Sequence, residues 1–388
     1  MVKILPNKFK ILYLTYHPEI GGGEIILLSL LAKLDRKIFD PIVVVTQKGQ
    51  LSQRLKELKI KTYILPLNGY LVRTFFVPGI SLGGIFKFLR LAKKVKPNLI
   101  HLNHLNLAIY AGIVGKILKV PVVATAHGTW DCIYFYQDFV NNFFVDKIFA
   151  NTPKVAANIA KRKIFNRKKV TVIPFGVDIN KFKPGNKRLA KRILGLSSGD
   201  FVVSIVGRLD PVKDHLNFLK AAEIVNKKYS NIIFYIVGST LGDFSKSNNT
   251  FNKIQNFLKE NANLAKNVIF GGFIEDVPKV YQASDILVSS STSESFGLAL
   301  VEASACEIPV IATNTGGQSL IVKDNITGYL VKPERPDLLA KRILRLTKDS
   351  KLRQKFGENG RKFVTSNFTI ENYVSRIEKK YLSLVYNN

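Results

Sequence analysis

Two glutamates bracket a segment of the sequence whose residue types could bind a sugar phosphate. Glu294 and Glu302 are separated by seven residues in ESFGLALVE, and the surrounding pattern predicts a helix start with Ser293 or Ser295 as its N-cap. A Glu302 carboxylate on the apolar side of that helix needs a partner, because burying it alone costs several kcal/mol. Sugar hydroxyls would meet this need, and the free amides of a helix start favour an anion such as phosphate. The alternative is a surface loop with a satisfied glutamate.

Two cations follow a predicted strand in the same half of the chain. Arg208 and Lys213 lie in GRLDPVK, directly after the apolar run of residues 201–206. At the carboxyl end of a strand, an Arg fork and a Lys point charge could hold a diphosphate and stabilise the charge of a leaving nucleotide. Taken alone, the pair could equally be two surface cations.

The first half of the chain contributes a glycine turn and a histidine. Gly22 and Gly23 come after the first strand pattern and before a helical run, so their backbone could approach a ligand closely; a structural turn is the alternative. His127 ends the apolar run VPVVATA, at the predicted carboxyl end of a strand, and is expected to face a ligand. The other four histidines are interpreted as structural residues: His17, His101, His104 and His215.

The sequence lacks the motifs of several other chemistries. It has no Asp-x-Asp and no set of His, Cys and carboxylates with metal spacing. A Walker P-loop is also missing, which argues against P-loop NTPase activity. Arg208 and Lys213 are expected to neutralise the charge of a leaving diphosphate, as a metal ion could do. We therefore expect neither a metal nor a cofactor.

The net charge of +30 is far above what solubility requires and predicts an anionic partner. Residues 1–180 hold 27 Lys and Arg against 9 Asp and Glu, whereas residues 181–388 hold 31 against 19. Arg73, Phe75 and Phe76 precede a basic amphipathic pattern at 85–97, which favours an anionic membrane surface. A helix with solvated lysines and a lysine-rich proteome are the alternatives. Nucleic acid is not expected, because no zinc-finger, RNP-type or basic-zipper motif occurs.

Apolar runs alternate with helical patterns along the chain, which predicts an α/β protein with parallel sheets. The 388 residues predict two domains. Turn-rich residues 174–185 mark the boundary between Rossmann-like domains at 1–178 and 179–367, with 368–388 as a segment that could return to the first domain. Such domains predict a cleft at the carboxyl ends of both sheets. Strands are expected at 10–16, 41–46, 62–65, 98–102, 120–126, 147–150, 169–173, 201–206, 232–237, 268–270, 286–288, 310–312 and 328–331.

The amino-terminal sequence MVKILPNKFKILYLTY is interpreted as a first strand, because its apolar run is short and no small-residue cleavage site follows. No run of 18 apolar residues occurs anywhere, so a spanning helix is not expected. Cys132 and Cys306 lie far apart in the sequence and suit a reducing compartment. We expect a cytoplasmic protein that is either free or peripheral on the inner face of the cell membrane.

The segment ESFGLALVE resembles the donor site of retaining glycosyltransferases of family 4 with the GT-B fold, in which a Glu, seven residues and a second Glu recur. The resemblance covers most of the chain. It implies that Glu294 faces the donor sugar, that Glu302 faces the nucleotide ribose, and that Arg208 and Lys213 clamp the diphosphate. His127 is similar to a histidine that contacts the donor sugar. Further binding positions that it implies are Gly22, Gly23, Phe273 near the base, Ser295, Phe296, Gly297 and Leu298. For the segment 271–273 a glycine turn is the alternative.

The same resemblance implies a hexosyltransferase of cell-envelope glycan synthesis. It would move a sugar from a UDP- or GDP-sugar to a hydroxyl of a lipid-linked or polysaccharide acceptor, retaining the anomeric configuration by a front-face mechanism without a metal. Trp130 and Asp131 would lie on the acceptor side. A sugar-nucleotide epimerase of GT-B shape and a non-catalytic, membrane-associated sugar-binding protein stay open as alternatives. The chain departs from the family pattern at Asp214, where glycine is common, and at Ser319, where Pro-Glu is frequent.

Overall fold

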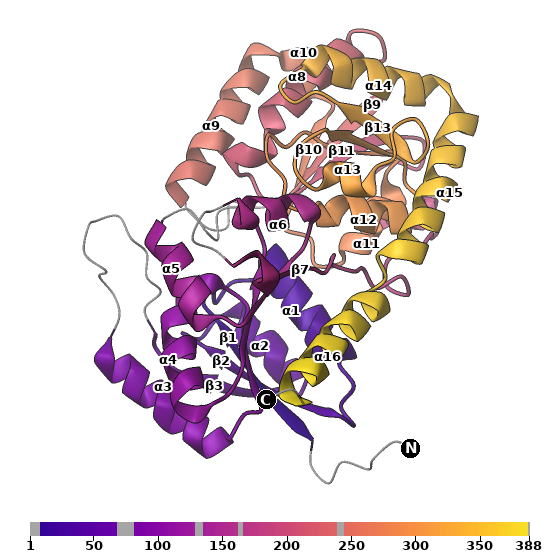
Figure 1. Cartoon of the computed structure of the whole chain (residues 1–388). Helices are drawn as coiled ribbons and strands as arrows, with labels where there is room; N and C mark the ends of the chain where they lie inside the picture. Colours follow the sequence, from indigo (N-terminus) through magenta and orange to yellow (C-terminus); the bar gives the residue numbers. More distant parts are fainter. Residues whose placement is uncertain (1–7, 68–80, 129–134, 162–165, 239–243, 387–388) are drawn as a thin grey trace. The chain divides into compact units, whose positions relative to one another are not determined.

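The computed structural model describes residues 8–67, 81–128, 135–161, 166–238 and 244–386. The chain forms two compact units, the first from Met1–Gly176 with Ile370–Asn388 and the second from Val177–Thr369 (Figure 1). Several expectations fall outside the described residues: those on Arg73, Phe75, Phe76, Trp130, Asp131 and Cys132.

The first unit is built on a parallel sheet of seven strands in the order β3-β2-β1-β4-β5-β6-β7. Its inner strands are rich in apolar residues and almost wholly buried, as expected for a sheet covered on both faces, whereas the edge strands β3 and β7 are partly exposed. Their bounds are β1 (Phe9–Thr15), β2 (Phe39–Val45), β3 (Lys61–Ile64), β4 (Leu99–Leu102), β5 (Val122–Ala126), β6 (Lys147–Ala150) and β7 (Val170–Val172).

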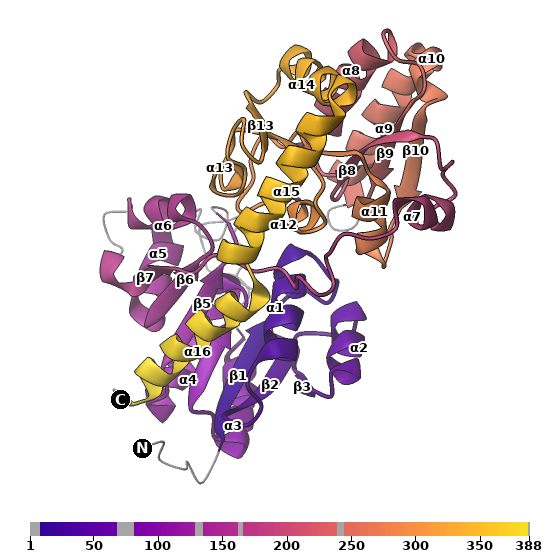
Figure 2. The ribbon, with the colours of Figure 1, turned by 90° about the vertical axis from the view of Figure 1, so that its right-hand side faces the viewer.

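Helices cover both faces of this sheet. One face packs Leu12 and Ile100 against Phe88 and Tyr110, and the other packs β1 against the carboxyl-terminal helix, where the hydroxyls of Tyr13 and Tyr381 lie 3.1 Å apart. Figure 2 shows that helix, α16, beside α1. The helices are α1 (Gly22–Lys33), α2 (Gln50–Glu57), α3 (Leu82–Val95), α4 (Ala108–Leu118), α5 (Phe135–Phe144), α6 (Pro153–Ala160) and α16 (Ile370–Tyr386).

The second unit repeats this plan with a parallel sheet of six strands in the order β10-β9-β8-β11-β12-β13. The strands are β8 (Phe201–Val206), β9 (Ile232–Val237), β10 (Val268–Gly272), β11 (Ile286–Ser289), β12 (Val310–Thr313) and β13 (Gly328–Val331). The helices are α7 (Lys187–Ile193), α8 (His215–Asn226), α9 (Phe244–Glu260), α10 (Ala262–Ala265), α11 (Val277–Ala283), α12 (Leu298–Ala305), α13 (Gln318–Ile321), α14 (Pro336–Lys348) and α15 (Ser350–Asn367).

The strand predictions are confirmed, each to within two residues at both ends. The predicted start of the helix that carries Glu302 is wrong. It begins at Leu298 with Gly297 as N-cap, and no side chain caps it. Gly297 has φ 99°, a left-handed conformation that glycine adopts without strain, so the chain turns there and not at a serine. Among the helices that the structure describes, none is both long and apolar enough to cross a bilayer.

Candidate active site

An ion pair joins two of the predicted site residues in the second unit. The Nζ atom of Lys213 lies 2.5 Å from Oε2 of Glu294, and both side chains are largely buried. The other carboxylate oxygen, Oε1, accepts a hydrogen bond from the Ser295 amide at 3.1 Å. Glu294 is therefore oriented by two donors, while its remaining lone pairs can accept hydroxyls.

Two loops at the carboxyl edge of the sheet are tied together to make this pair. The Ser290 hydroxyl donates to the carbonyls of Lys213 (3.0 Å) and Asp214 (2.8 Å), and the Thr292 amide donates to Val212 at 2.9 Å. Asp214, the departure from the family glycine, adopts φ 49° and caps α8 by accepting from the Asn217 amide at 3.1 Å. Aspartate is one of the residues that adopt this left-handed conformation at single positions.

A glycine turn supports Glu294 from behind. Gly316 has φ 60°, and a Cβ there would lie 1.5 Å from the Glu294 carbonyl oxygen. The Gly317 amide donates to that same oxygen at 2.9 Å. This turn thus packs against the first glutamate of the ESFGLALVE motif. Phe296 is buried, with its ring 5.9 Å from that of Phe368, so its side chain belongs to the core.

Arg208 lies at the end of β8 and is half exposed. Its Nη2 atom is 3.6 Å from Oδ2 of Asp210, a distance typical of a loose surface pair. The other oxygen of Asp210 accepts from the Val212 amide at 3.0 Å, at the start of the short 3-10 turn Pro211–Lys213. Arg208 is thus attached to the loop of Lys213 while its guanidinium stays open to solvent and to a ligand.

Glu302 does have a partner, and the sequence did not reveal it. The hydroxyl of Tyr281, in α11, donates to Oε2 of Glu302 at 2.6 Å. Burial raises the pKa of Glu302 to about 7, although the Tyr281 hydrogen bond and the nearby charge of Lys181 act in the opposite direction. The phenol of Tyr281 also packs against Phe182, with ring centroids 6.0 Å apart. The second oxygen of Glu302 is left for another donor.

The first unit has its own cluster of ionisable groups, at the start of α1. Glu24 is buried, accepts from the Gly21 amide at 3.1 Å, and lies 2.7 Å from Nε2 of His104. Burial alone would disfavour the carboxylate, but the hydrogen bond and charge of His104, together with His17, keep the pKa of Glu24 below its usual value of 4.5. Sequence reasoning missed this role of His104.

His127 joins the same cluster. Its Nε2 atom is 3.2 Å from Oδ1 of Asn103, and its ring centroid is 5.3 Å from that of His104. Gly23, in the first turn of α1, leaves room for the ring, because a Cβ there would lie 3.2 Å from it. Burial lowers the pKa of His127 to about 3, so the ring is neutral at physiological pH. Its Nδ1 atom is buried and has no hydrogen-bond partner in the described part of the chain.

The remaining predicted positions, Phe273 and Gly22, take part in none of the ion pairs and hydrogen bonds described above. Phe273 follows β10 and is well exposed; before it, Gly271 makes space for the Tyr235 hydroxyl. Gly22 opens α1, with Gly21 as N-cap.

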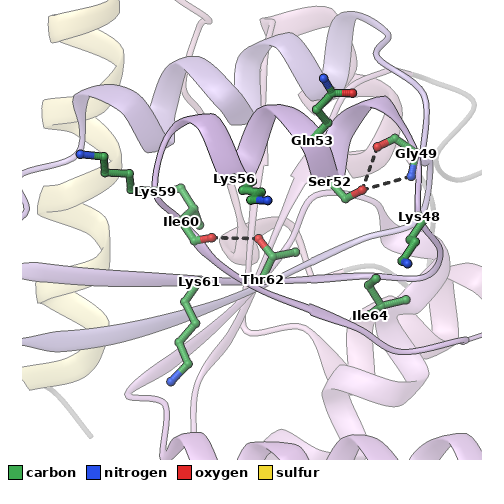
Figure 3. A pocket seen from close by; sticks show the side chains of 10 residues that line it. All are labelled: Lys48, Gly49, Ser52, Gln53, Lys56, Lys59, Ile60, Lys61, Thr62 and Ile64. Carbon is green, nitrogen blue, oxygen red and sulfur yellow. Dashed lines mark hydrogen bonds between the residues drawn. The ribbon is translucent and has the colours of Figure 1, made fainter.

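A cavity of about 760 Å³ lies between α2 and β3 in the first unit, and none of the predicted site residues lines it. Four lysines are among its lining residues (Figure 3): Lys48, Lys56, Lys59 and Lys61. Within the described residues no His, Cys and carboxylate group has the geometry of a metal site.

Known families match both halves of the sequence. Residues 20–181 match Glycosyltransferase Family 4, and residues 186–363 match Glycosyl transferases group 1. The chain belongs to these glycosyltransferases. The expected family and enzyme class are thereby confirmed, whereas an epimerase or a binding protein has no support from the named relatives.

Two relatives illustrate the family. The chain is 26% identical to a UDP-Gal:alpha-D-GlcNAc-diphosphoundecaprenol alpha-1,3-galactosyltransferase of Escherichia coli, over the whole of both chains. It is 25% identical to the capsular polysaccharide biosynthesis glycosyltransferase CapM of Staphylococcus aureus, over 78% of this chain and 80% of that one.

A solved structure has the same fold. Anabaena HepE in complex with UDP aligns with a TM-score of 0.84 over 97% of this chain and all of the other, at 22% identity. The same protein with UDP-glucose aligns with a TM-score of 0.83 over 96% of this chain and 99% of the other, at 21% identity. At this identity the likeness establishes the fold alone, and that fold is GT-B, as the sequence predicted.

Proposed function

We propose that this glycosyltransferase moves a sugar from a UDP- or GDP-sugar to a hydroxyl of a lipid-linked or polysaccharide acceptor, with retention at the anomeric carbon and without a metal. The observation that carries the proposal is the Lys213–Glu294 pair, which places an ammonium group and a carboxylate 2.5 Å apart beside the loop that leads into α12. A pyrophosphate and the sugar attached to it offer the complementary groups, namely anionic oxygens and hydroxyls.

The proposed chemistry is a front-face displacement. The bond between the anomeric carbon and the diphosphate oxygen breaks, and its electron pair leaves with the nucleoside diphosphate. Lys213 and Arg208 stabilise the charge that develops on that group, together with the amides of the first turn of α12. The acceptor oxygen forms the new bond on the same face of the sugar, and its proton passes to the departing phosphate.

The other residues are assigned by their free hydrogen-bonding capacity. Glu294 orients sugar hydroxyls, and Glu302 accepts from the ribose with the oxygen that Tyr281 leaves open. His127 offers Nδ1 to the sugar. Phe273 and its neighbours contact the base. The two cations of the diphosphate clamp, Arg208 and Lys213, are proposed to take the place of a metal ion.

The acceptor is proposed from the named relatives and from the charge. The Escherichia coli relative is named for a diphosphoundecaprenol-linked substrate and the Staphylococcus aureus one for capsular polysaccharide synthesis. Residues 1–180 carry three times as many cations as carboxylates, which suits an enzyme that works at an anionic membrane. We place the protein in the cytoplasm, on the inner face of the cell membrane.

A panel of UDP-, GDP- and ADP-sugars tests this function. Release of nucleoside diphosphate that depends on a polyprenyl-diphosphate-sugar acceptor, and that persists in EDTA, is expected. Proton NMR of the product should show the anomeric configuration of the donor. Conversion of the donor sugar without release of diphosphate would identify an epimerase, and binding without turnover would identify a sugar-binding protein; either result rejects the proposal.

A further inference from the structure

The helices α3, α4 and α5 lie side by side on one face of the first sheet (Figure 1). Each of them exposes large apolar side chains. On α5, Phe139 and Phe143 are 60% and 54% exposed, and their rings are parallel with centroids 6.2 Å apart. Ile117, near the end of α4, is 54% exposed. Exposed large apolar side chains that gather on one face mark an interaction site.

The outer side of α3 continues this surface. Phe88, Ala92 and Val95 point inward and are buried, whereas Leu82 and Phe86, one turn apart on the other side, are 82% and 67% exposed. Neither of these two residues belongs to the buried core of the unit. They are therefore available for a contact outside that core.

Cations accompany the apolar side chains. On α3, four exposed cations follow Phe86: Lys87, Arg90, Lys93 and Lys94. On α4, the Nζ atom of Lys116 lies 3.0 Å from the ring centroid of Phe143. The sequence has no Asp or Glu between Glu57 and Asp131, a stretch that holds ten Lys and Arg. The only acidic side chain on α5, Asp138, is buried.

We propose that this surface, the α3–α5 face, docks the enzyme on an anionic lipid bilayer, and the proposal rests on the lipid-linked acceptor of the proposed function. Phenylalanine and leucine side chains enter the interface between headgroups and acyl chains, while lysine and arginine neutralise the lipid phosphates. Bases or a protein partner would also accept aromatic contacts. Only a bilayer presents a uniformly anionic plane with apolar material directly beneath it, which matches cations and exposed aromatics spread over three helices.

Vesicle co-sedimentation with two charge-matched variants tests the face. The first variant replaces the α3 cations by glutamine (Lys87, Arg90, Lys93 and Lys94), and the control replaces the four lysines around the α2–β3 cavity (Lys48, Lys56, Lys59 and Lys61). Both lose four charges, so a general charge effect would weaken them equally. We expect the α3 variant to lose about tenfold or more in affinity for phosphatidylglycerol vesicles and the control less than about twofold.

The apolar part is tested by Phe139→Ser with Phe143→Ser. This variant should lose binding to the same vesicles by about tenfold even at low salt, where charge attraction is strongest. Equal losses in the two charge variants, equal binding to neutral and anionic vesicles, or tighter binding to nucleic acid would overturn the proposal. Concentration-dependent dimers that the Phe139 and Phe143 substitutions abolish, without any change in vesicle binding, would assign the face to a second copy and also overturn it.

The activity of the variants separates this proposal from the proposed function. Transfer to a short-chain, water-soluble acceptor analogue should be unchanged in all three variants, because none of the substituted residues belongs to the candidate site. If the wild-type protein binds anionic vesicles through this face but transfers no sugar, the proposed function fails and the docking face stands. If it transfers sugar but ignores vesicles, the docking face fails alone.

Discussion

In the second unit the candidate carboxylate Glu294 is paired with the ammonium group of Lys213, whereas in the first unit Glu24 is paired with the imidazole of His104. Both clusters follow parallel strands at their carboxyl ends, and both use glycine to bring groups close together. They differ in charge. The cluster of the second unit also has the open guanidinium of Arg208, while that of the first unit continues into the neutral ring of His127.

This difference suggests a division of labour. A lysine ammonium group that can exchange its carboxylate partner for a phosphate suits recognition of an anion. A buried neutral imidazole suits recognition of uncharged hydroxyls, because it can hydrogen-bond without carrying a charge that would have to be desolvated. We therefore expect the diphosphate to depend on the second unit, and the first unit to act on uncharged parts of the substrates.

The largest expected effect comes from Lys213→Ala. Removing the ammonium group leaves Glu294 without its partner and the leaving diphosphate with one cation less, so kcat should fall by about 10²- to 10³-fold. Lys227→Ala is the matched control, since it breaks a lysine–glutamate pair of similar length, 2.7 Å, on α8. That control should keep wild-type activity.

A loss in Lys213→Ala that appears only in KM would mean that the lysine binds the ground state and the transition state equally. A kcat within about threefold of wild type would contradict the proposed diphosphate clamp.

His127→Ala should lower kcat/KM by about tenfold to a hundredfold, because the proposed hydrogen bond between the ring and the sugar is lost. Since burial holds the pKa of His127 near 3, the ring stays neutral from pH 5 to 8, and His127→Asn should restore part of the activity without altering the pH profile. If an inflection near neutral pH disappears in His127→Asn, the ring titrates there and the contrast between the two units is wrong.

Glu302 gives a smaller effect that depends on pH. Burial raises its pKa from 4.5 to about 7, so the stability that the protonated form contributes is fully present below pH 4.5 and lost as the pH rises through 7. In the proposed ribose contact the ionised form of Glu302 accepts hydroxyls best, and affinity for a nucleotide-sugar should therefore rise by up to about tenfold between pH 6 and 8. Calorimetric titration checks this.

Glu302→Gln is the control for that pH dependence. The amide cannot titrate, so the variant should bind the nucleotide-sugar with an affinity that is flat over the same range. A slope that survives in this variant would assign the titration to another group.

The smallest effect is expected from Asp210→Asn. The amide oxygen still caps the Val212 N–H, which preserves the loop, but the charge opposite Arg208 is gone. Affinity for a nucleoside diphosphate should rise by less than about threefold, in line with the small energy of an exposed ion pair. A fall in affinity would mean that Asp210 positions Arg208 productively and does not compete for it.

The strands could be predicted from the sequence for a physical reason, and the enzyme class could be predicted from the Glu294 motif. Buried parallel strands are short apolar runs bounded by turns, and β8, for example, has the bounds that its residues predict. The Glu294 motif was equally visible, because residues that must lie in one loop are close in sequence. Its helix start was misplaced because the serines offered a side-chain cap, whereas the chain uses the left-handed Gly297.

Partners that are distant in sequence could not be predicted. Tyr281 is 21 residues before Glu302, and His104 is 80 residues after Glu24. The sequence around Tyr281 and around His104 does not distinguish these residues from other aromatic or histidine residues on apolar elements. Only the packing of α11 against α12, and of β4 beside β1, brings these groups within hydrogen-bonding distance.

The most direct test of the central claim compares a nucleoside diphosphate with the corresponding monophosphate. Isothermal titration calorimetry of both ligands with wild type and Lys213→Ala measures how much of the affinity depends on the second phosphate. We predict that the substitution weakens the diphosphate by about tenfold to a hundredfold and the monophosphate by less than about threefold. Equal losses for the two ligands, or no loss for either, would contradict a pyrophosphate site built around Lys213.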